Sequence, residues 1–219
     1  MDNHFSKELQ SGEIELIIGN SNSNFSGVTS TMLQVMSYQK KLINLRVMGT
    51  HFLPDSALAI SFWQTAKMCR TPLKNGKWRV FHARRVDEMI QGVLLKYLFR
   101  AKIKLVFSSA AQRKRSASTV WLTRKMDAVV AVSKRSAEFL CDPPDLVNPH
   151  GVQINDYLPA KDKQQARADL GPGGKYGIGT LGRVRKLKGV HLFVEARTHP
   201  SYYTTCTLPT NLTASSPAC

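Results

Sequence analysis

The fold of this chain is indicated most clearly by residues 13–36, EIELIIGNSNSNFSGVTSTMLQVM. The first part is dense in aliphatic and β-branched side chains and predicts a strand over 13–18. A loop rich in Gly, Asn and Ser follows over 19–27. Apolar residues then recur at helical spacing, which predicts a helix over 28–41. This stretch is therefore expected to form a strand, a tight loop and a helix in succession.

The same alternation continues toward residue 148. Further strands are predicted over 45–48, 79–82, 103–107, 127–132 and 145–148, and helices over 86–100, 116–126 and 133–140. Ser133 is expected to cap the last helix, with Ser136 as an alternative. The pattern predicts an α/β fold with a Rossmann-like, doubly wound parallel sheet. Such sheets bind ligands at the carboxyl ends of their strands, so chemistry is expected in the loops after Ile18, His82, Phe107 and Val132.

The chain changes character after this alternation. We expect an N-terminal domain over 1–150, a polar, turn-rich linker over 151–175 containing a short helix (164–170), and the start of a second α/β domain over 176–196. Residues 197–219 are rich in Thr, Ser and Pro and follow no period, so they are expected to be a divergent, disordered tail. One strand and one helix cannot bury a core of their own. The sequence therefore predicts a truncated or frame-shifted product.

Charge and composition narrow the partners. Lys+Arg 31 against Asp+Glu 15 gives a net charge of +16 in 219 residues, which favours nucleic acid, acidic lipid or a phosphorylated ligand. No stretch reaches the roughly 18–20 apolar residues of a transmembrane helix, and the first eight residues do not resemble a signal peptide. The His and Cys residues show no metal-ligand spacing, so no metal site is expected.

The loop over 26–31 is the first candidate binding element. Gly27 lacks a Cβ, so backbone can approach a ligand closely, and Ser26 and Val28 flank it. A helix beginning here would offer free N–H groups to phosphate. The alternative is an ordinary Gly/Ser turn with a Thr29 or Ser30 cap.

Basic side chains follow two other predicted strands. His82 ends one strand and is followed by Arg84 and Arg85; the His could bond sugar hydroxyls while the arginines face anions. The run 182–189, GRVRKLKG, could bind a diphosphate or be a solvated loop. The overlapping GIGTLG at 177–182 lies within a predicted strand and is not a dinucleotide-binding fingerprint.

Two further basic stretches have less specific interpretations. Residues 96–104, KYLFRAKIK, could rest on an anionic membrane surface, although a helix running into a buried strand is slightly favoured. Residues 112–115, QRKR, form a solvated charge run or face an acidic acceptor.

Taken in order, these motifs resemble the family 4 glycosyltransferases, which have the two-domain GT-B fold, and most closely the bacterial lipopolysaccharide core mannosyltransferases. The tracts that carry the likeness span roughly residues 14–196. They are FSGVTST (25–31), HARR (82–85), KLVFSSAAQR (104–113), MDAV (126–129), NPHGV (148–152), GRVR (182–185), KG (188–189) and LFVEA (192–196). Each motif alone is weak, and their order and spacing make the resemblance specific.

The resemblance implies a retaining hexosyltransferase without a metal or other cofactor. The N-terminal domain would bind a lipid-linked oligosaccharide acceptor, and the C-terminal domain a nucleotide sugar, with GDP-mannose expected. His82 would contact the transferred sugar, Gly27 would approach the donor phosphates, and Arg183 and Lys188 would neutralise the leaving diphosphate. The enzyme would lie in the cytoplasm, peripheral to the inner face of the cytoplasmic membrane and in contact with its anionic lipids.

The sequence also departs from the family pattern. Family members carry a Glu-x₇-Glu region that binds the ribose and sugar, and this chain has no such region after Lys188. We therefore expect the chain to be inactive. Two alternatives remain: a basic nucleic-acid-binding protein, which lacks any recognition motif here, and the non-catalytic acceptor half of a split transferase. Under the favoured interpretation no nucleic acid is bound.

Overall fold

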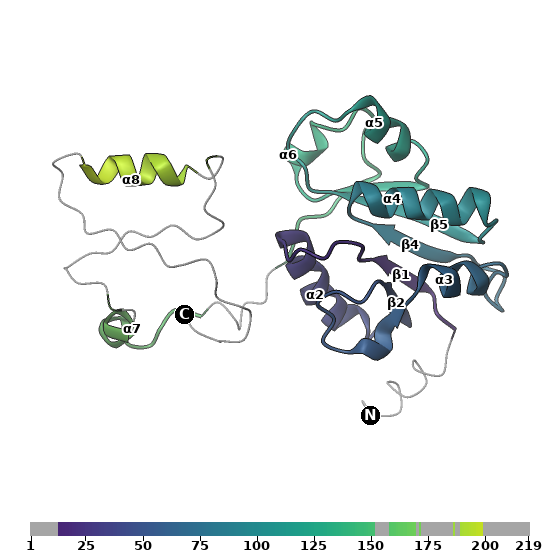
Figure 1. The fold of residues 1–219 in the computed structure, drawn as a ribbon, viewed down its shortest axis with the longest axis horizontal. Helices are drawn as coiled ribbons and strands as arrows, with labels where there is room; N and C mark the ends of the chain where they lie inside the picture. The colour runs from purple at the N-terminus through teal and green to yellow at the C-terminus, as the bar shows by residue number, and fades with distance from the viewer. Residues whose placement is uncertain (1–12, 152–157, 170, 172–185, 187–188, 199–219) are drawn as a thin grey trace. The chain divides into compact units, whose positions relative to one another are not determined.

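The computed structural model describes residues 13–151, 158–169, 171, 186 and 189–198. It divides into two compact units, Met1–Val152 and Gln153–Cys219, which we describe separately. Figure 1 shows strands and helices alternating along the first unit.

The first unit is built on a seven-stranded sheet in which all pairings are parallel. The strands are β1 (Leu16–Gly19), β2 (Leu45–Met48), β3 (Ala59–Ile60), β4 (Arg79–Ala83), β5 (Ile103–Ser109), β6 (Ala128–Ala131) and β7 (Leu146–Val147). Their spatial order is β3-β2-β1-β4-β5-β6-β7. The direction of winding reverses between β1 and β4, which is the topological switch point of such a sheet. The predicted doubly wound α/β fold is thus confirmed.

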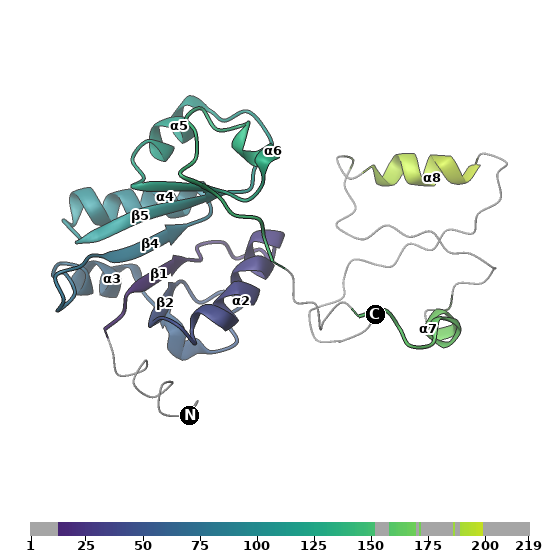
Figure 2. The same ribbon diagram turned by 180° about the vertical axis from the view of Figure 1, so that it is seen from behind.

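Helices cover both faces of the sheet. The helices of this unit are α2 (Gly27–Gln39), α3 (Phe62–Met68), α4 (Val86–Val93), α5 (Ala117–Thr123) and α6 (Lys134–Ala137). Successive residues of a strand point to opposite faces. Leu16 and Ile18 accordingly pack with Met32 and Met36 of α2. Ile17 joins a second core that contains residues of α3, α4 and α5, and Figure 2 shows the same unit from behind.

The first predicted elements are present with shifted ends. The strand begins at Leu16 rather than Glu13, and the helix extends over Gly27–Gln39 rather than 28–41. The N-cap is Ser26, whose hydroxyl accepts from the Thr29 N–H, so the alternative of a Thr29 or Ser30 cap is wrong. Ser26 is the N-cap because its extended backbone places the hydroxyl over the free N–H groups of the first helical turn. Ser133 caps α6, as predicted.

Two parts of the first unit differ more. The predicted helix over 86–100 is regular only through Val93 and continues as a π-helical turn, Leu94–Leu98. Strand β3 and helix α3 were not predicted from the sequence. β3 is two residues long, too short to show any period, whereas Ser61 and Gln64 at the start of α3 form a capping box that a sequence pattern can reveal.

The second unit contains two described helices, α7 (Lys163–Asp169) and α8 (Val190–Thr198). They correspond to the helices predicted over 164–170 and 189–196. The predicted strand over 176–181 lies outside the described residues. The division into linker, incomplete second domain and tail stays a prediction, with α8 continuing two residues past the expected start of the tail.

Candidate functional site

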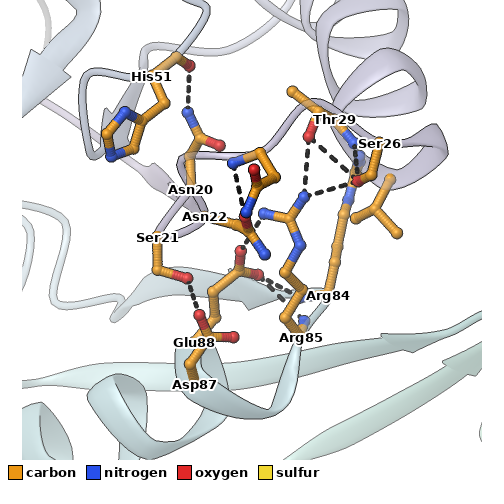
Figure 3. Close-up of polar contacts among 12 residues, drawn as sticks. Asn20, Ser21, Asn22, Ser26, Thr29, His51, Arg84, Arg85, Asp87 and Glu88 are labelled. Atoms are coloured by element: carbon orange, nitrogen blue, oxygen red, sulfur yellow. Dashed lines mark hydrogen bonds and ion pairs between the residues drawn. The ribbon is translucent and has the colours of Figure 1, made fainter. Parts of the chain in front are cut away.

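The polar side chains of interest lie at the carboxyl edge of the sheet, on both sides of the switch point. The loop after β1 carries Asn20, Ser21 and Ser26, and the segment after β4 carries Arg84 and Arg85. Because β1 and β4 are adjacent, these two segments meet, as Figure 3 shows. The topology therefore brings together residues about 60 positions apart.

A buried carboxylate organises this meeting point. Glu88, in the first turn of α4, is fully buried. Its Oε2 accepts hydrogen bonds from the backbone N–H groups of Arg84 at 2.7 Å and Arg85 at 3.2 Å. Its Oε1 lies 3.3 Å from Nη1 of Arg85. Burial raises the pKa of Glu88, an effect that these hydrogen bonds and the Arg85 charge oppose. Sequence analysis did not single out this residue.

Arg85 joins the two segments through its side chain. Its Nη2 donates to the Ser26 hydroxyl at 3.0 Å and to the Thr29 hydroxyl at 2.8 Å. The Arg85 side chain is only 13% exposed. The guanidinium thus fixes the N-terminus of α2 against α4 (Figure 3). Substrate binding by Ser26 and Arg85 stays a prediction. In the structure these two side chains bond each other.

His82 lies near the carboxyl end of β4. Its Nε2 is 2.8 Å from the Ser108 hydroxyl on the neighbouring strand β5. Burial, with a smaller effect from the Arg84 charge, lowers the pKa of His82 to about 3. The imidazole is therefore neutral near pH 7, able to exchange hydrogen bonds but not to donate a proton from its charged form. Ser108 was not predicted as part of the site.

Arg84 has a guanidinium that the protein does not fully satisfy. Its Nη1 is buried and has no hydrogen-bond partner. Burial lowers the pKa of Arg84, and Glu88 counteracts this. The Arg84 charge also lowers the pKa of His150, after burial as the larger cause. A buried guanidinium nitrogen without a partner is costly for the protein alone and is suited to an incoming anion.

A cavity of about 560 Å³ opens beside these arginines. It is bounded by the N-terminal ends of α2, α4 and α5. Its lining residues are Val28, Arg84, Arg85, Val86, Phe107, Ala110, Ala111, Arg113, Lys114, Arg115, Ser116 and Thr119. Five of them are cationic and none is acidic. Gly27 lies next to Val28, and a Cβ built on it would meet nothing within 4 Å. The space in front of that backbone is open, as the predicted role of Gly27 requires.

Arg115 is a cavity residue whose importance the sequence did not show. The run 112–115 suggested a solvated segment or one facing an acidic acceptor. In the structure Arg115 bonds the Ser109 hydroxyl and lies 5.3 Å from the Phe107 ring centroid. Its Nε is buried without a partner, and burial lowers its pKa. At least this arginine is directed at the cavity rather than free in solvent.

Asn20 holds the loop after β2 beside the site. Its Nδ2 donates to the His51 carbonyl at 2.7 Å. A side chain at Gly49, whose φ is +126°, would meet the Asn20 carbonyl oxygen at 2.1 Å. This close approach requires glycine. A second cavity, of about 450 Å³, lies here and includes Ser61 and Gln91.

The other half of the predicted site is not described. Arg183 and Lys188 lie outside the described residues. Within the described residues, no cluster of three or more His, Cys, Asp or Glu side chains could hold a metal ion. None of the helices in the described part of the chain has the length and apolar character needed to cross a membrane.

No protein-family model matches the sequence. Two curated proteins are similar to it over most of its length. The lipopolysaccharide core biosynthesis mannosyltransferase LpcC of Rhizobium leguminosarum bv. viciae is 40% identical over 185 residues, which cover 84% of this chain and 52% of that protein. LpsB of Rhizobium meliloti (strain 1021), of the same description, is 38% identical over 187 residues with the same coverage. The chain is homologous to lipopolysaccharide core mannosyltransferases. It spans about half the length of these mannosyltransferases.

The fold has a solved counterpart among known structures. The crystal structure of Anabaena HepE in complex with UDP-glucose matches with a TM-score of 0.62 over 89% of this chain and 60% of that one. A complex of the same protein with UDP and glucose matches equally. At 13% identity this likeness concerns the fold alone. It agrees with the predicted Rossmann-like α/β fold.

Proposed function

We propose that this chain carries the acceptor-binding part of a glycosyltransferase that transfers a hexosyl group to a lipopolysaccharide core acceptor. Mannose from GDP-mannose is the proposed donor group, since the homologous proteins are mannosyltransferases. The reaction breaks the bond between the sugar and the diphosphate and forms a bond to an acceptor hydroxyl, with retained configuration. The observation that carries the proposal is the cationic cavity at the switch point, found in a chain with this homology.

The described residues have distinct parts in this proposal. Arg84 and Arg115 bind acidic groups of the acceptor through the guanidinium nitrogens that lack protein partners. His82 acts as a neutral hydrogen-bonding group toward the transferred sugar, oriented by Ser108. Gly27 and the N-terminus of α2 approach the donor phosphates. Arg183 and Lys188 stabilise the charge that develops on the leaving diphosphate.

We further propose that residues 1–219 alone bind acceptor without turning over donor. The expected Glu-x₇-Glu donor-binding region has no counterpart in these 219 residues. The cellular location is proposed to be the cytoplasmic face of the inner membrane, where the +16 net charge favours a peripheral contact with anionic lipid.

The test combines acceptor binding with a turnover assay. Isothermal titration of the purified chain with a core oligosaccharide that carries phosphate and sugar acid groups should show saturable binding. Release of GDP from GDP-mannose, with the same acceptor, should stay at the no-protein background. Clear turnover would contradict the inactivity proposal. Absence of acceptor binding, together with a steep salt dependence of single-stranded RNA binding, would contradict the acceptor role and favour a nucleic-acid function.

A further inference from the structure

A second basic surface lies at the opposite, amino edge of the sheet. It is made by exposed aromatic rings alternating with lysines, and we call it the aromatic–lysine belt. Its members are Trp78, Lys96, Tyr97, Leu98, Lys102, Lys104, Trp121 and Lys125. They come from the starts of β4 and β5, from the π-helical turn after α4, and from the end of α5.

Contacts connect most of the belt into one continuous surface. Lys125 lies 5.4 Å from the Trp121 ring centroid and 5.9 Å from that of Tyr97. Lys96 lies 5.7 Å from the Tyr97 ring and 2.6 Å from a carboxylate oxygen of Asp127. The same carboxylate group is 3.5 Å from Lys104.

The series then continues to the start of β4. Lys104 lies 5.1 Å from the Trp78 ring centroid, and Lys102 lies 5.7 Å from it. Segments from three parts of the sequence thus share one surface. The preference for a helix running into a buried strand over 96–104 is correct for Ala101 and Ile103, which are buried, but it does not account for the exposed side chains of Tyr97 and Leu98.

The belt is both apolar and positively charged. Trp121 is 55% exposed, Tyr97 57% and Leu98 67%. Two of its four lysines, Lys96 and Lys104, pair with the carboxylate of Asp127, whereas Lys102 and Lys125 lie over the Trp78 and Trp121 rings. Burial alone would raise the pKa of Asp127, but the Leu105 N–H and the ammonium groups of Lys96 and Lys104 hold it below its usual value. The carboxylate is therefore ionised near pH 7 and the belt keeps a net positive charge.

We propose that the aromatic–lysine belt is the surface through which the chain makes the peripheral contact with an anionic lipid bilayer that the proposed function includes. Tyr and Trp side chains with an apolar body and a polar edge are favoured at the headgroup level. Lysines beside them are attracted by anionic headgroups. A nucleic acid is the less suitable occupant: bases stack on open ring faces, whereas the rings of Trp78, Tyr97 and Trp121 each already have an ammonium group over one face. Leu98 offers no ring at all.

This surface is separate from the proposed sugar-transfer site. The belt lies where the strands begin, and the cationic cavity lies where they end. The seven residues of β5, at about 3.3 Å each, place roughly 20 Å between the two edges. Membrane binding through the belt therefore does not depend on whether the chain binds acceptor or transfers sugar. Vesicle binding and acceptor binding can each fail without the other.

Vesicle flotation of the full chain tests the proposal. We expect the protein to float with vesicles of phosphatidylcholine containing 30% phosphatidylglycerol and to stay behind with phosphatidylcholine alone. Trp fluorescence should shift to shorter wavelength on binding. The double variant Lys102→Ala/Lys104→Ala should weaken binding about 25-fold, which is about fivefold per lysine. Equal binding to both kinds of vesicle would overturn the proposal.

Aromatic variants separate the belt from general charge attraction. Tyr97→Ala/Trp121→Ala should reduce binding at least tenfold while circular dichroism and the melting temperature stay near the wild-type values. The matched control is Tyr38→Ala, because Tyr38 is also 57% exposed and also has a lysine, Lys41, 5.9 Å from its ring centroid. It lies on α2, outside the belt, and should bind as wild type. Equal losses in the belt and control variants would overturn the proposal, as would tighter binding of poly(U) RNA through the belt residues.

Discussion

The two edges of the sheet hold their cations in different ways. At the carboxyl edge the cations that make defined contacts are arginines, and their guanidinium groups are largely withdrawn from solvent, as at Arg84 and Arg85. In the aromatic–lysine belt at the amino edge the cations are lysines lying over exposed rings, as at Lys104 and Lys125. A guanidinium presents donors in a fixed plane, whereas an ammonium is a mobile point charge. The arginines of the carboxyl edge are therefore suited to holding one ligand in a fixed position. The lysines of the amino edge are suited to a surface on which charged groups can change position.

The carboxylates at the two edges show the same difference. Glu88 and Asp127 each bind a cation and at least one backbone N–H. Glu88 is fully buried and its pKa is raised. Asp127 is partly exposed and its pKa is lowered. Glu88 therefore serves to hold two segments in place, and Asp127 to space the lysines of a surface.

The largest expected effect comes from removing the buried carboxylate. Glu88→Ala leaves two N–H groups and the Arg85 guanidinium without their acceptor, so unfolding free energy should fall by about 3–5 kcal/mol. The matched variant at the other edge, Asp127→Ala, should cost about 1–2 kcal/mol because its lysines can turn to solvent. Urea unfolding followed by circular dichroism measures both. Equal losses would contradict the contrast between the edges.

Sequence alone predicted the framework of the carboxyl edge better than its chemistry. The strand over 45–48 was predicted with its observed ends, because three of its four residues are apolar and Asn44 and Gly49 bound them. Glu88 was not singled out because a single carboxylate on a predicted helix is usually solvated. The fold places it against Gly19, where a Cβ would lie 2.9 Å from the Glu88 side chain. That proximity depends on the pairing of β1 with β4, which no local pattern contains.

The next effect concerns ligand affinity at the cavity. Arg84→Ala should weaken binding of the acidic core oligosaccharide about 10- to 100-fold, corresponding to one charge-assisted hydrogen bond. Stability should not fall in parallel, since Nη1 of Arg84 has no partner to lose. Arg124→Ala is the control, because Arg124 is 62% exposed and pairs only with Asp142 among the described residues. Isothermal titration and thermal melts give the two readouts, and a loss of stability without a loss of affinity would assign Arg84 a structural role.

A smaller effect is expected from pH. His82 has a pKa near 3 in the folded chain, against 6.5 in the unfolded chain. Below pH 6.5 the unfolded state binds a proton that the folded state does not, so stability falls as the pH is lowered toward 3. His82→Asn should remove this dependence. Between pH 7 and 5 the wild type should lose about 1–2 kcal/mol more than the variant in urea unfolding, and identical pH slopes would mean that His82 is not held neutral by burial.

The aromatic–lysine belt illustrates the remaining limit of sequence patterns. The stretch 96–104 allowed two interpretations, a helix running into a buried strand and a membrane-facing surface. Ile103 is buried in the core, as the first requires, while Tyr97 and Leu98 are exposed; the membrane contact stays a proposal. Trp78 and Trp121 join this surface only because α5 and the starts of β4 and β5 converge at one edge. The order of charges along the sequence shows neither tryptophan as a neighbour of this stretch. The cavity also depends on contacts that the sequence does not show, since Arg115 contacts Ser109 and the Phe107 ring.

The smallest expected effect distinguishes the two glycines beside the site. A Cβ at Gly27 would meet no atom within 4 Å, and Ala is a better helix former than Gly at the first position of α2. Gly27→Ala should therefore leave unfolding free energy within about 0.5 kcal/mol of wild type. Gly19→Ala is the contrasting control and should lose about 1–3 kcal/mol by overpacking against Glu88. If Gly27→Ala destabilised the chain as much, the glycine would be required by the fold. If it does not, the fold does not require a glycine at this position.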